Sequence, residues 1–94
     1  MREAKVSNEL FEQVQGKLIT NPNELIPVIV SLNEGVDIEA ARTELSAAGF
    51  QVERVIPGPV QIIAGHIQAK DVVGLAQDSK VRKMEYDGKT FAVV

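Results

Sequence analysis

Residues 25–86 repeat one order of predicted elements, strand-helix-strand, on either side of a tight turn at Pro57-Gly58-Pro59. The six elements are a strand over Leu25–Leu32, a helix between the cap residue Asp37 and Gly49, strands over Phe50–Ile56 and Val60–Ile67, a helix over Ala69–Gln77 and a strand over Val81–Tyr86. This order predicts an α+β fold, a ferredoxin-like βαββαβ sandwich whose antiparallel four-stranded sheet carries two helices on one face.

Residues 1–24 precede this pattern and have their own helical signal. Ser7 can cap a short helix, which the turn residues 20–23 would end. The apolar positions of this helix form one stripe, consisting of Leu10, Phe11, Val14 and Leu18. We therefore expect an N-terminal helical appendage over residues 1–24 and a ferredoxin-like domain over residues 25–94. The appendage either covers part of the open sheet face or hangs free.

Composition excludes several classes of function. The 94 residues suit one domain and contain no cysteine, so disulfides, zinc–thiolate sites and thiol nucleophiles are ruled out. A net charge of −3 and an aromatic content of 4% disfavour nucleic-acid binding. No segment approaches the ~20 apolar residues of a membrane span, and residues 1–16 have no continuous apolar region of the signal-peptide kind. The expected location is the cytoplasm, with no membrane partner.

The sequence contains no recognisable constellation for catalysis. His66 is the single histidine, and the residues around it supply no nucleophile or orienting acid, so a structural or surface role is expected. The glycines do not form a phosphate-binding loop. Four acidic residues surround one helix start, where the helix dipole explains the first-turn carboxylates better than a cation does: Glu34, Asp37, Glu39 and Glu44. We therefore predict no enzyme, no catalytic residue, no metal site and no cofactor.

Residues 71–87, DVVGLAQDSKVRKMEYD, carry a resemblance to a known family. A helix, a short turn and then Val-x-x-Met-Glu-x-Asp resemble the end of subtilisin propeptides, the inhibitor I9 family. The resemblance extends over residues 25–94, with two departures: His66 stands where an aromatic residue is common, and Ser79 replaces the usual Pro or Gly of the turn. No protease domain follows within the 94 residues, so the chain resembles the stand-alone inhibitors.

The resemblance implies a subtilisin-like protease as partner, bound without catalysis by an inhibitor or propeptide-type chaperone. The family packs its sheet on two surface helices of the protease and lays its C-terminal tail through the substrate cleft as an added strand. On that basis Asp87 or Glu85 would lie near the N-termini of the protease helices. The tail in the cleft would consist of Gly88, Lys89, Thr90, Phe91, Ala92, Val93 and Val94. A terminal valine is a poor match for the large S1 pocket of most subtilisins.

Two alternatives stay open. The tail from Lys89 onward could instead be a fifth strand or an arm on the chain's own sheet edge, since burying Phe91 could contribute about 1.5–3 kcal/mol. The second alternative, from another class of function, is a small-molecule-sensing or assembly module of the same fold. Such a module would form a homodimer through its sheet edges.

Overall fold

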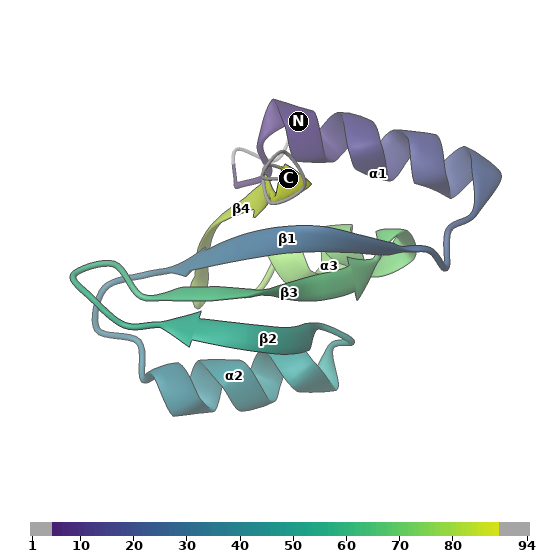
Figure 1. Ribbon diagram of the computed structural model, residues 1–94. Coiled ribbons are helices and arrows are strands. Elements are labelled where there is room, and N and C mark those ends of the chain that lie inside the picture. Colours follow the sequence, from purple (N-terminus) through teal and green to yellow (C-terminus); the bar gives the residue numbers. More distant parts are fainter. Residues whose placement is uncertain (1–4, 89–94) are drawn as a thin grey trace, which may run out of the picture.

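The computed structural model describes residues 5–88 and contains one four-stranded antiparallel sheet in the order β2-β3-β1-β4 (Figure 1). In chain order the elements are α1 (Asn8–Thr20), β1 (Leu25–Leu32), α2 (Ile38–Ala47), β2 (Gln51–Ile56), β3 (Ile62–Gln68), the 3-10 helix η1 (Ala69–Asp71), α3 (Val72–Ala76) and β4 (Val81–Tyr86). This order and sheet topology confirm the predicted ferredoxin-like βαββαβ fold.

The strand β1 lies at the centre of the sheet, between β3 and β4. Val28 lies opposite Gly65 on β3, and Val30 lies opposite Met84 on β4. The side chains of β1 alternate between two faces, and those pointing to one face are at most 2% exposed: Ile26, Val28, Val30 and Leu32. We call this side of the sheet the covered face.

The helices α2 and α3 supply the layer that buries the covered face. Ala41 and Leu45 of α2 and Val72, Leu75 and Ala76 of α3 belong to the same buried cluster as the residues of the covered face. Figure 1 shows α3 behind β1 and β3, with α2 beside β2. Full burial of a Leu or Val side chain stabilises the folded state by about 1.5–3 kcal/mol. Most of the hydrophobic stabilisation therefore lies on this side.

The helix α1 packs at the β4 side of the sheet (Figure 1). Its N-terminus is tied to β4 by two backbone hydrogen bonds: Ser7 N–H donates to Met84 O at 3.0 Å, and Met84 N–H donates to Lys5 O at 2.6 Å. Between them Val6 forms a parallel bridge with Met84. The Ser7 hydroxyl caps the helix by accepting from the Leu10 N–H at 3.2 Å, as predicted.

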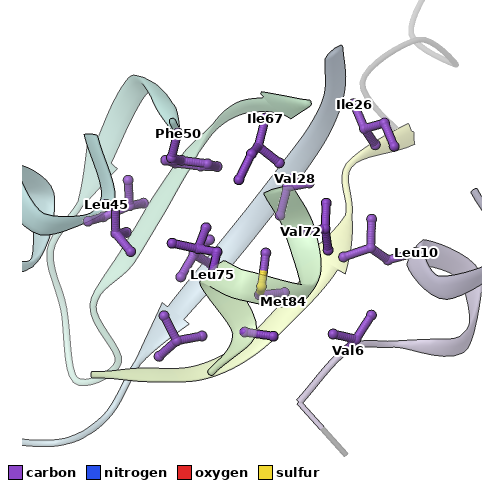
Figure 2. Close-up of a cluster of buried hydrophobic side chains, with 14 of the residues drawn as sticks. Val6, Leu10, Ile26, Val28, Leu45, Phe50, Ile67, Val72, Leu75 and Met84 are labelled. Carbon is purple, nitrogen blue, oxygen red and sulfur yellow. The ribbon is translucent and has the colours of Figure 1, made fainter. Parts of the chain in front are cut away.

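The predicted apolar stripe of α1 is only half buried. Leu10 and Val14 enter the main cluster, and Figure 2 shows Leu10 on the same side of the sheet as Val72 and Met84. Phe11 and Leu18 remain 37% and 44% exposed, because they lie further round the helix from the sheet. The domain boundary predicted at residue 24 stays a prediction.

Three elements differ from their predicted bounds, and the smallest difference is in β2, which begins at Gln51 instead of Phe50. The predicted helix over Ala69–Gln77 divides into η1 and the short α3, because the N–H groups of Ala69 and Lys70 donate to Glu24 and Pro22 carbonyls of the segment before β1. The third strand begins at Ile62, two residues later than predicted.

The sheet is irregular where β4 begins. Its register against β1 shifts between Ser31 and Leu32. Val81 and Met84 are consequently both fully buried, so the side chains of β4 do not alternate strictly between the two faces. None of the helices described over residues 5–88 is both long enough and apolar enough to span a membrane.

Candidate protein-binding face

The sheet side opposite α2 and α3 has no helix layer of its own, and we call it the open face. The strand register places on it Pro27, Ile29 and Ser31 of β1, Gln51, Arg54 and Ile56 of β2, Ile62, Ala64 and His66 of β3, and Lys83 and Glu85 of β4. Its middle is apolar, with Ile29 directly opposite Ala64. At its margins Leu25 and Ile56 are 40% and 41% exposed. An apolar centre with polar margins is typical of a protein-binding surface.

Four charged side chains of the open face form two pairs. Lys83 Nζ lies 3.3 Å from Glu85 Oε2, and His66 Nδ1 lies 2.7 Å from Glu53 Oε2. The contact between His66 and Glu53 is an ion pair when the imidazole is protonated and a hydrogen bond when it is neutral. The exposed Arg54 of β2 also lies on this face, directly opposite Ala64.

The partner of His66 was missed by the sequence analysis. A register shift between Val52 and Arg54 inserts Glu53 as an extra residue in β2, beside β3. This bulge brings the carboxylate to the histidine, and no local signal in the sequence marks it. Within residues 5–88, no group of three or more His, Asp or Glu side chains is placed to hold a metal ion.

The structure brings Glu85 and Asp87 together. Both line a hollow of about 180 Å³ at the meeting of β1, β4 and the start of α1, with Ser7, Glu9, Ile29 and Tyr86 as the other lining residues. Asp87 follows β4 directly, and its N–H donates to Pro27 O at 3.0 Å. The two carboxylates therefore lie at the open-face side of the β4 end, where the resemblance expects a binding site.

Gly88 is the last residue that the structure describes. A Cβ added at this position would overlap the ring of Tyr86, so the backbone at Gly88 passes directly against that ring. The remaining predicted site residues lie outside the described residues: Lys89, Thr90, Phe91, Ala92, Val93 and Val94.

A second hollow, which we call the α1–β1 groove, was not predicted. It has a volume of about 280 Å³ and lies between α1 and the first residues of β1. Its lining residues are Gln13, Lys17, Glu24, Leu25, Ile26, Pro27, His66 and Tyr86. An ion pair closes one side, with Lys17 Nζ 2.9 Å from Glu24 Oε2. The sequence signal that could have found it is Pro27, which has no N–H for a partner strand.

The two outer edges of the sheet differ. The bridge between Val6 and Met84 covers the outer side of β4. The outer side of β2 has no strand neighbour among residues 5–88, but the bulge at Glu53 interrupts its regular spacing. Bulges on edge strands hinder further strand pairing.

The turn before β4 holds the one carboxyl group with a clear pKa shift among the described residues. Partial burial by itself raises the pKa of Asp78, but a hydrogen bond shared with the Glu44 carboxyl group and one donated by the Lys80 N–H outweigh it, assisted by the charges of Lys80 and Lys5. The pKa of Asp78 therefore falls below its usual value of 3.8. Its Oδ1 accepts from the Lys80 N–H at 2.8 Å, which suits a structural turn.

Comparisons of the chain with models of protein families, with curated proteins and with solved structures found no match. The likeness to the I9 inhibitors therefore rests on the residues quoted above, and the open face is the feature from which a function has to be argued.

Proposed function

We propose that this chain is a protein-binding domain that acts on a subtilisin-like serine protease, as an inhibitor or as a propeptide-type chaperone, and not as an enzyme. The observation that carries the proposal is the open face. All buried side chains of α2 and α3 pack on the covered face, which leaves the half-buried Ile29 in the middle of the open face for a partner.

The carboxylates of Glu85 and Asp87 supply the polar part of this proposed interface. They lie at one end of the open face, beside the same hollow. Helix N-termini present unpaired N–H groups and a positive dipole end, which favour a carboxylate by about 0.3–1 kcal/mol each. A partner that presents two helices to the sheet would therefore be oriented by Glu85 and Asp87 while Ile29 supplies apolar contact.

The tail from Gly88 to Val94 is the part that would inhibit. It leaves the sheet at Asp87, whose N–H is still bonded to Pro27 O at 3.0 Å. In the proposed complex the tail pairs with the substrate-binding strands of the protease by backbone hydrogen bonds, so it blocks the cleft as a substrate would. If the protein works in the cytoplasm, as the sequence analysis expects, the partner would be an intracellular protease of this class.

An inhibition assay tests the proposal. The intact chain at micromolar concentration should slow peptide hydrolysis by a subtilisin. A variant ending at Gly88 should stay folded but lose inhibition. Ile29→Arg should weaken inhibition at least tenfold, because it puts a charge in the apolar middle of the face. Thr43→Arg, on the exposed side of α2, is the matched control and should have no effect. An intact chain that neither slows the protease nor co-elutes with it would contradict the proposal.

A second candidate remains, a ligand-sensing or assembly module that forms a homodimer through sheet edges. One observation favours it: β2 has no strand neighbour on its outer side among residues 5–88. Light scattering separates the two candidates. A dimer that is lost in Val55→Pro, which removes a backbone donor from β2, would support the module. A protein that stays monomeric at millimolar concentration would contradict the module.

A further inference from the structure

The N-terminal end of β1 extends beyond the C-terminal end of its antiparallel neighbour β4. β1 begins at Leu25, but the ladder between β1 and β4 reaches only to Tyr86 opposite Val28, followed by the bond from Asp87 N–H to Pro27 O. Pro27 has no N–H, so it cannot return a hydrogen bond to a partner strand. The first two residues of β1, Leu25 and Ile26, therefore have no strand neighbour on this side among residues 5–88.

The backbone of Leu25 faces this unpaired side. Along a strand the N–H and C=O groups point alternately to the two neighbours. The carbonyl of Glu24 accepts from Ala69 on the β3 side, whereas Pro27 bonds to the β4 side. By alternation Leu25 presents its N–H and C=O to the β4 side, directly into the α1–β1 groove that it lines. An unpaired strand edge beside a groove is a template for an added strand.

We propose that the segment Lys89–Val94 of the same chain occupies the α1–β1 groove in the unbound protein and pairs with Leu25. The first support is position. The described chain ends at Gly88, whose backbone passes against the ring of Tyr86, and Tyr86 is itself a lining residue of the groove. The segment therefore starts at the mouth of the groove.

Reach and composition also fit. The edge from Pro27 to Leu25 spans about 7 Å, and six extended residues reach up to about 20 Å. The segment contains Phe91 and Val93, and the groove offers the side chain of Leu25, which is 40% exposed. A tethered segment has an effective concentration in the millimolar range, so it is favoured over the same segment from a second copy.

The docked segment would compete with a partner. This consequence rests on the proposed function. If the tail inhibits a protease, only molecules whose tail is free can bind it, so the apparent affinity for the protease is the intrinsic affinity multiplied by the fraction of such molecules. The docking itself depends only on the groove and the unpaired edge, so it can be tested with no protease present.

Cross-linking tests the docking directly, since the chain has no cysteine of its own. The variant Gln13→Cys with Phe91→Cys places one thiol in the groove and one in the tail. The control is Ile19→Cys with Phe91→Cys, because Ile19 is on the same helix but 85% exposed. Under mild oxidation we expect an intramolecular disulfide to form at least tenfold faster in the first variant. Equal rates, or disulfide-linked dimers as the main product, would overturn the proposal.

Amide hydrogen exchange provides a second measurement that does not depend on substitutions. Removing Lys89–Val94 should speed exchange of the Leu25 amide at least tenfold. The amide of Val30, which faces β3, should be unaffected and is the internal control. An unchanged Leu25 rate would also overturn the docking.

Loss of protease inhibition on disulfide formation would link the two proposals. If the chain does not inhibit a subtilisin but its Leu25 amide is protected by the tail, the proposed function is contradicted and the docking is supported.

Discussion

The covered and open faces of β1 are built from one strand and have different environments. The residues on the covered face are at most 2% exposed, whereas those on the open face are half-buried, or exposed in the case of Leu25. Both faces are nonetheless apolar over much of β1, since Pro27 and Ile29 alternate with Ile26 and Val28. This difference shows that the apolar side chains of the covered face suffice to build the core. The second apolar face is what needs a functional explanation.

The largest effect expected from this contrast comes from truncating one isoleucine on each face. Ile67→Ala removes a fully buried side chain of the covered face and should lower the free energy of unfolding by about 2–5 kcal/mol. Ile29→Ala should cost less than half as much, because Ile29 already contacts solvent. Denaturant unfolding of both variants measures the difference. Similar losses would mean that the open face is covered in the free protein.

A smaller loss is expected where the covered face approaches a neighbouring backbone. A Cβ at Gly65 would overlap the Gln51 carbonyl of β2 and come within 3.2 Å of the Phe50 ring. Gly65→Ala should therefore separate β2 from β3 and lower the free energy of unfolding by about 1–3 kcal/mol. Gly74→Ala is the matched control, because no atom lies within 4 Å of its added Cβ. A fully stable Gly65→Ala protein would show that this strand pair is loosely packed.

A gain in stability tests whether α1 belongs with the covered face. Gly16 lies within α1, and an added Cβ meets no atom within 4 Å. Gly16→Ala should stabilise the helix by about 0.5–1 kcal/mol. If α1 unfolds together with the sheet, as the burial of Leu10 and Val14 indicates, the melting temperature of the whole protein should rise. Slower amide exchange in α1 alone would instead make the helix a separate unit.

The smallest effect is expected at Asp78, in the turn before β4, which belongs to neither face. Folding lowers the pKa of Asp78, so its contribution to stability is present above about pH 4. That contribution is lost as the pH falls through the lower pKa of the folded state. Asp78→Asn should cost a few tenths of a kcal/mol at pH 7 and make stability less sensitive to acid below pH 4. Glu12→Gln, on the exposed side of α1, is the control. Identical acid profiles for the Asp78→Asn and native proteins would contradict the assignment.

The regular parts of the fold could be predicted because their signals are local. The bounds of β1 and β4 and the caps Ser7 and Asp37 follow from patterns within a few residues, and the structure confirms them. The split between η1 and α3 could not be predicted. It depends on the carbonyls of Pro22 and Glu24, which lie far from Ala69 in sequence.

The candidate site shows the same limit. The sequence indicated Glu85 and Asp87, and the structure places both beside one hollow. The pair of His66 with Glu53 depends on a bulge, and the α1–β1 groove depends on where β4 stops relative to β1. Both are properties of strand register, which the residue pattern alone does not define.

The parallel bridge between Val6 and Met84 also has a consequence for biosynthesis. The ribosome makes Lys5 to Ser7 among the first of the described residues, but their hydrogen-bonding partner on β4 is made among the last. This edge of the sheet therefore cannot close until β4 has left the ribosome. Because such distant contacts slow folding, the nascent chain exposes Leu10 and Val14 until β4 emerges, and that interval is when a chaperone would be needed most.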